Sequence, residues 1–129
     1  MSDDGVIAHL PSNPGAPALA RRIVREHSVE LSPALAEDAL LIVDELVTNA
    51  VQHGQAEITL RLQRHDDGIN VGVRDAGESF VPPGPGLPAP DRMGGRGLYM
   101  VAALASSWGI TPHSGTGKTV WFELHEDGR

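Results

Sequence analysis

The sequence predicts an α/β fold, a two-layer sandwich in which a mixed, mostly antiparallel sheet packs against three helices. Apolar and polar residues alternate in two pairs of segments joined by turn residues, which is typical of half-buried hairpins. Three other segments repeat their apolar residues at helical spacing. The 129 residues suit a single domain, residues 1–129, that is long enough to bury a core. Helices combined with antiparallel strands favour a sandwich.

The N-terminal third predicts one strand and one helix. A short strand is expected over Val6–Leu10, followed by the proline- and glycine-containing loop PSNPGAP. The helix is expected over Ala18–His27, where Leu19, Ile23 and Val24 fall at helical spacing among charged residues.

The longest predicted helix lies in the stretch SPALAEDALLIVDELVTNAVQHG. Ser32 suits the N-cap and Pro33 suits the first helical position, because proline lacks the N–H that would be unsatisfied there. Gly54 suits the end of the helix.

The second half alternates strands, a loop and a helix. EITLRLQRH and INVGVRD alternate apolar and polar residues around the turn HDDG, which predicts an antiparallel hairpin. Five prolines exclude a regular element from Glu78–Gly95, and a loop of that length favours a functional or mobile segment. A helix is expected over Gly97–Trp108, and then a hairpin of GITPH and KTVWFELH turned by SGTG.

Composition excludes several classes of function. The net charge of −7 and scattered basic residues, nine arginines and one lysine, argue against direct nucleic-acid binding. Without cysteine the chain forms neither a disulfide nor a thiolate metal site. No apolar run approaches the roughly 20 residues of a membrane span, and the acidic N-terminus lacks signal-peptide features. A cytoplasmic protein is therefore expected.

A polar stripe on the longest helix is the first candidate for chemistry. Glu45, Asn49, Gln52 and His53 are spaced so that they share one helix face. Burying such groups without partners would cost several kcal/mol, on the order of the penalty for an unpaired polar group. The stripe therefore either faces water or lines a polar site.

Two later segments favour the site. In RDAGESF a strand ends at Asp75, and Gly77 would let a planar ligand approach the backbone. In MGGRGLYMV, Gly94, Gly95 and Gly97 open a helix, whose first N–H groups can bind an anion. The pattern matches neither a P-loop nor a Rossmann fingerprint.

Together these motifs resemble the N, G1 and G2 boxes of the GHKL superfamily of ATPases and kinases, whose domain is the Bergerat ATP-binding fold. The order is E-x-x-x-N-A-x-x-H on a helix, D-x-G after a strand and G-G-x-G-L at a helix start. DELVTNAVQHG, DAGESF and GGRGLYMV are most similar to the anti-sigma factor serine kinases of bacteria. The resemblance covers about Pro33–Leu124.

The resemblance implies an ATP–Mg²⁺ site with roles for three residues of the long helix. Asn49 would give its side-chain oxygen to Mg²⁺, a cation that takes hard oxygen ligands. Glu45 would be the catalytic general base for the serine hydroxyl. His53 would meet the phosphates, or else is an exposed histidine at the helix end.

The same resemblance assigns the base and the phosphates to the later segments. Asp75 would accept the adenine amino group, Gly77 would lie near the base, and Thr119 would support both. The helix start that meets the phosphates comprises Gly95, Arg96, Gly97 and Leu98. Arg92, Arg96 and Lys118 are candidate counter-charges, or solvated side chains.

The function implied is that of an anti-sigma factor with serine/threonine protein kinase activity. Its partners would be a sigma factor and, as phosphoryl acceptor, an anti-anti-sigma protein of the STAS type. Arg21, Arg22 and Arg25 are candidate contacts for a homodimer or a partner.

Three alternatives stay open. The proline-rich segment VPPGPGLPAP suits a non-catalytic, nucleotide-gated binding module, because proline limits the φ changes of a hinge. A detached histidine kinase domain is disfavoured because no dimerisation helix is expected before Ala18. A ligand-free structural domain would require three ordered motifs to coincide.

Overall fold

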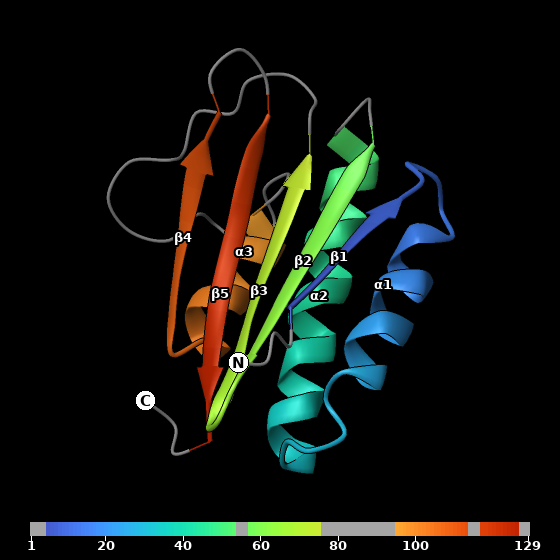
Figure 1. Ribbon diagram of the computed structural model, residues 1–129. Coiled ribbons are helices and arrows are strands. Elements are labelled where there is room, and N and C mark those ends of the chain that lie inside the picture. The colour runs from blue at the N-terminus through green and yellow to red at the C-terminus, as the bar shows by residue number, and fades with distance from the viewer. Residues whose placement is uncertain (1–4, 54–56, 76–94, 114–116, 127–129) are drawn as a thin grey trace.

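The computed structural model describes residues 5–53, 57–75, 95–113 and 117–126. Figure 1 shows two layers, a sheet and three helices that cover one of its faces, which confirms the predicted sandwich. The elements are β1 (Gly5–Leu10), α1 (Ala16–Glu26), α2 (Pro33–His53), β2 (Ile58–His65), β3 (Gly68–Asp75), α3 (Gly95–Leu104), β4 (Ser107–Pro112) and β5 (Lys118–His125).

The sheet has five strands in the order β1-β2-β3-β5-β4. Each of the four described pairings is antiparallel, so this sheet lacks the parallel component that the prediction of a mixed sheet allowed. The hairpin predicted around HDDG is confirmed as β2 and β3, with Ile58 opposite Asp75 and His65 opposite Gly68.

Alternation gives the sheet a covered face and an open face. On the covered face, Leu62, Val71 and Phe122 lie side by side and are buried against the helices. On the open face, Trp121 lies between Gly72 and Gly109. A Cβ on Gly109 would stand 2.7 Å from the Trp121 ring, so the indole lies over β4 where no side chain intervenes. Apolar residues thus concentrate under the helices, where burial stabilises the fold.

The longest helix, α2, begins as predicted. The Leu35 N–H donates to Ser32 Oγ at 3.2 Å, so Ser32 caps the helix and Pro33 is its first residue. Ala39, Ile42 and Val43 are fully buried on the side that faces the sheet and α1. The predicted end at Gly54 lies outside the described residues.

The first helix turns Val24 and Ile23 to the core as their spacing suggested, but not Leu19. Ala16, Ala20 and Val24 are fully buried, whereas Leu19 is 37% exposed. Small residues let α1 approach α2 closely, and packing at that contact decided which side turns inward. An ion pair between Arg21 and Asp44 also joins the two helices.

The end of α3 was predicted four residues too late. The helix ends at Leu104, and Ser107 and Trp108 belong to β4 instead. The Ser106 N–H donates to the Glu123 carbonyl oxygen at 2.8 Å, and Trp108 pairs with Phe122 on β5. These long-range bonds to β5 outweigh the helical spacing of the local sequence.

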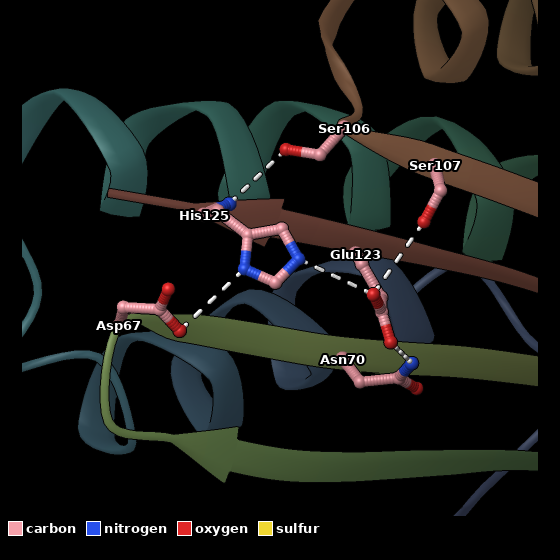
Figure 2. A network of polar contacts seen from close by, with 6 residues as sticks. All are labelled: Asp67, Asn70, Ser106, Ser107, Glu123 and His125. Atoms are coloured by element: carbon pink, nitrogen blue, oxygen red, sulfur yellow. Dashed lines mark hydrogen bonds and ion pairs between the residues drawn. The ribbon is translucent and has the colours of Figure 1, made fainter. Parts of the chain in front are cut away.

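A polar network lies on the open face, near the turn between β2 and β3 (Figure 2). Asn70 donates to Glu123 Oε2 at 2.8 Å, while Ser107 and His125 approach Oε1 of the same carboxylate at 3.4 and 3.3 Å. Asp67 lies 3.5 Å from the other ring nitrogen of His125. The hydrogen bond from Asn70, more than the neighbouring histidines, lowers the pKa of Glu123, although partial burial opposes the shift.

Candidate functional site

The polar stripe of α2 lies at the margin of the core. Glu45 and Asn49 are both half-buried, while Leu46 and Ala50 beside them are buried. Gln52 is exposed, and His53 is the last residue of the helix. Glu45 and Asn49 thus occupy one face of α2 at an intermediate depth, where they reach solvent or a ligand without the full cost of burial.

Asp75 is the most buried carboxylate among the described residues and closes β3. Its relative exposure is 6%, and the Lys118 ammonium donates to its Oδ2 at 2.7 Å. The two residues are direct cross-strand partners of β3 and β5, so their side chains leave the sheet on the same face. That face is the one covered by helices, because Val73 and Val120 next to them are buried in the core.

The elements that carry these residues meet at one end of the molecule. In Figure 1 the C-terminal end of α2, the end of β3 and the start of β5 lie at the same end. The helix α2 packs directly against β3, β5 and α3. The C-terminal half of α2, which carries Glu45 and Asn49, therefore runs toward the end of the fold that holds the Asp75–Lys118 pair.

The start of α3 supplies backbone donors at the same end. This helix begins at Gly95, includes Arg96, Gly97 and Leu98 in its first turn, and packs on α2. It runs back toward the start of β4, so its N-terminus points to the end where β3 finishes (Figure 1). The first N–H groups of a helix have no partner within it, and they favour anions such as phosphate.

Thr119 lies apart from Asp75. It pairs with Arg74 across β3 and β5, so its side chain leaves the sheet on the open face. There His113 Nε2 lies 2.7 Å from its hydroxyl, and its methyl group lies near Gly72. The residue beside the Asp75 carboxylate is Lys118, which the sequence suggested only as a counter-charge. Counting alternation from Val120 and Phe122, both apolar and inward, would have placed Lys118 inward and Thr119 outward.

The remaining predicted site residues are only partly described. Gly77 and Arg92 lie outside the described residues, as does the side chain of His53. The same holds for the side chains of Arg96 and Leu98, so these residues stay predictions from the sequence.

The amide oxygen of Asn49 is chemically suited to a magnesium ion whose other ligands are phosphate oxygens and water. Within the described ranges, no group of three or more histidine, aspartate or glutamate side chains is placed to hold a metal by itself. Asn49 offers one hard amide oxygen, and Mg²⁺ commonly takes one or two protein oxygens together with waters and phosphate oxygens. The donor chemistry of the α2 stripe is consistent with that mode.

Two hollows on the described part of the chain lie elsewhere. One, of about 400 Å³, lies on the open face of the sheet, where Arg61, Gly72, Thr119 and Trp121 line it. The other, of about 450 Å³, lies between α1 and α2 and is lined by Arg21, Glu37, Leu40, Leu41 and Asp44. Neither of these two includes Glu45, Asn49 or Asp75.

The basic residues of α1 are mostly engaged within the chain. Arg21 pairs with Asp44 of α2, and Arg22 lies 3.5 Å from Glu26 one turn along the same helix. Arg25 is exposed.

No helix in the described ranges is both long enough and apolar enough to span a bilayer.

Comparisons with known proteins agree with the fold. A family model described as the histidine kinase-like ATPase domain matches residues 10–124. The crystal structure of the RsbU and RsbW domains of Rv1364c from Mycobacterium tuberculosis is similar, with a TM-score of 0.71 and 23% sequence identity. That match covers 94% of this chain and 31% of the other, so this chain spans about a third of the length of the chain that it matches. No curated protein matches the sequence.

Proposed function

Because the chain belongs to the histidine kinase-like ATPase domain family, we propose that it binds ATP with Mg²⁺ and phosphorylates a serine of a partner protein. The partner would be a small anti-anti-sigma protein of the STAS type, and the chain would also hold a sigma factor and thereby regulate transcription. The N, G1 and G2 motifs, which resemble those of the anti-sigma factor serine kinases, support this finer assignment.

One observation carries the nucleotide site: a buried carboxylate ends β3 on the helix-covered face, beside the helix that bears Glu45 and Asn49. The buried carboxylate of Asp75 offers acceptor oxygens, so it suits the exocyclic amino group of adenine, which donates hydrogen bonds. Its burial excludes water that would otherwise compete for the same hydrogen bond.

The other roles follow from position along the site. The first turn of α3, with Gly95 and Gly97, would receive the phosphates on its N–H groups. Asn49 would hold Mg²⁺, which when bound neutralises charge on the phosphate oxygens. Glu45, one helical turn before Asn49, would accept the proton of the attacking serine hydroxyl.

The kinase assignment is tested by incubating the protein with [γ-³²P]ATP and a panel of small STAS-type proteins. The wild type is expected to transfer label to a serine of one of them. In Glu45→Gln the transfer rate should fall at least about 100-fold, because a general base contributes roughly 10²–10⁴-fold. Its affinity for ATP should change less than about threefold, since a base acts mainly in the transition state.

Glu37→Gln is the matched control, because Glu37 is an exposed glutamate two turns earlier on the same helix. It should leave both transfer and binding unchanged. Equal loss of transfer and binding in Glu45→Gln would show that Glu45 is structural. Nucleotide-dependent partner binding with no transfer by the wild type would favour the non-catalytic module, which the five prolines of VPPGPGLPAP also favour.

A further inference from the structure

The most unusual feature of the candidate site is its lysine. Lys118 is the single lysine of the chain, against nine arginines. The side chain of Lys118 is partly buried, at 18% exposure, and its ammonium donates at 2.7 Å to Asp75, whose side chain is 8% exposed. A chain that otherwise carries its positive charge on arginine places its one ammonium against the carboxylate that the proposed function assigns to the base.

The pair is held in place by the sheet. Asp75 and Lys118 are opposite each other in the β3–β5 register, and the next inward pair, Val73 and Val120, is buried. The lysine stem therefore starts from fixed backbone, and its charge needs little reorganisation to reach the carboxylate. A buried carboxylate with such a partner is stabilised, and replacing the lysine withdraws one positive charge from its surroundings.

An amino group of a base would need the same acceptor. A carboxylate that already receives a charge-assisted hydrogen bond is a weaker acceptor for a neutral N–H, because the ammonium offsets part of its charge. If the base displaces the ammonium, the ion pair is present only in the nucleotide-free protein, and it stabilises that state relative to the complex. Both effects lower the affinity for nucleotide.

Building on the proposed function, we infer that Lys118 is an affinity-setting residue: it holds Asp75 as an internal counter-ion, and the purine base has to compete with it. The ammonium acts at the base end of the ligand. It therefore weakens binding of ATP, ADP and AMP by the same factor, whereas a lysine that contacted phosphate would strengthen ATP binding most.

The test compares Lys118→Met with the wild type by competition against a fluorescent ADP analogue. Methionine keeps the unbranched stem of the side chain, one atom shorter, and removes the ammonium. Lys118→Met should bind ATP, ADP and AMP roughly threefold to tenfold more tightly, as expected for loss of one competing charge-assisted hydrogen bond. Lys118→Arg keeps the charge and should stay within about twofold of the wild type.

Arg64→Met is the control for a general effect of removing a partly buried cation. Arg64 is 20% exposed and pairs with Glu30 at 2.5 Å. It lies opposite Ile69, near the turn at the far end of β2 and β3. Its substitution should leave all three affinities unchanged, so a similar gain in Arg64→Met would overturn the inference.

A second measurement does not depend on any substitution. In protein labelled with [ζ-¹⁵N]lysine, the only lysine ammonium signal belongs to Lys118. Saturating ADP should shift this signal or broaden it by exchange, because the base changes the surroundings of the ammonium. A signal unaffected by saturating ADP would overturn the inference.

The remaining outcomes separate this inference from the proposed function. Binding by both proteins, with Lys118→Met no tighter than the wild type, overturns the role of Lys118 alone. Weaker binding of ATP with unchanged AMP assigns Lys118 to the phosphates and also overturns it. If neither protein binds any of the three nucleotides, the proposed function fails and the inference fails with it.

Discussion

The two ends of the sheet hold their carboxylates in different ways. Where β3 ends, Asp75 is buried and forms an ion pair with Lys118, whose side chain leaves the sheet on the same face. Where β5 ends, Glu123 lies on the open face and is shared among Asn70, Ser107 and His125 (Figure 2). A charge in a dry setting depends strongly on each partner, whereas a charge in a wet network is screened and supported from several sides.

At the end of the sheet near the turn between β2 and β3, the backbones of β3 and β5 lie so close that they limit side-chain volume. Gly68 begins β3 opposite His125, and a Cβ added to it would stand 2.0 Å from the Leu124 carbonyl oxygen. A main-chain oxygen in a sheet cannot move aside as a flexible side chain can. One end of the sheet is therefore sensitive to a change of charge, and the other is sensitive to a change of side-chain volume.

The largest effect on stability should come from Gly68→Ala. Its methyl group has no room, so unfolding by urea should show a loss of about 3 kcal/mol, the upper range for overpacking. Gly72→Ala is the matched control, because its Cβ would meet the Thr119 methyl group at 3.3 Å, a side chain that can shift. It should cost about 1 kcal/mol or less. Equal losses in the two variants would contradict the contrast between the ends.

Asp75→Asn should have the next largest effect, and on binding. The neutral amide loses the charged acceptor, so nucleotide affinity should fall tenfold to a hundredfold, or about 1.4–2.7 kcal/mol. Competition against a fluorescent ADP analogue measures this change. Glu123→Gln makes the same chemical change at the other end and should leave affinity unchanged. If Asp75→Asn bound as tightly as the wild type, Asp75 would not be the acceptor of the base.

The smallest effect should come from Asn70→Ala, and it should depend on pH. Asn70 lowers the pKa of Glu123, so the wild type gains stability above the unfolded value of about 4.5 and loses it as pH falls through the lower folded pKa. After discounting for solvent screening, the variant should lose roughly 0.5 kcal/mol at pH 7. This difference should shrink in urea titrations as the pH falls below the unfolded pKa of Glu123. A difference that stayed constant with pH would mean that Asn70 acts through packing.

Local patterns were enough to predict most of the fold. Ser32 and Pro33 set the start of α2, and the alternation of β2 and β3 around HDDG set their hairpin, because each signal acts within a few residues. The boundary between α3 and β4 could not be predicted in this way. There, hydrogen bonds from Ser106 and the pairing of Trp108 with Phe122 come from a strand later in the chain.

The candidate site was predicted in part for the same reason. Spacing on one helix places Glu45 and Asn49 together, and the strand end identifies Asp75. The ion pair between Asp75 and Lys118 depends on the register between β3 and β5, and these two residues are 43 positions apart in the sequence. The family resemblance pointed to Thr119, the next residue along β5, whose side chain lies on the other face of the sheet.

The tryptophans on opposite faces of the sheet make the molecule its own optical reporter. Trp108 packs against the core beneath the helices, whereas Trp121 lies over Gly109 on the open face. With Trp121 replaced by phenylalanine, the remaining emission would follow the packing of α3 on the sheet. With Trp108 replaced instead, it would follow whatever covers the open face, so the two layers can be observed separately by fluorescence.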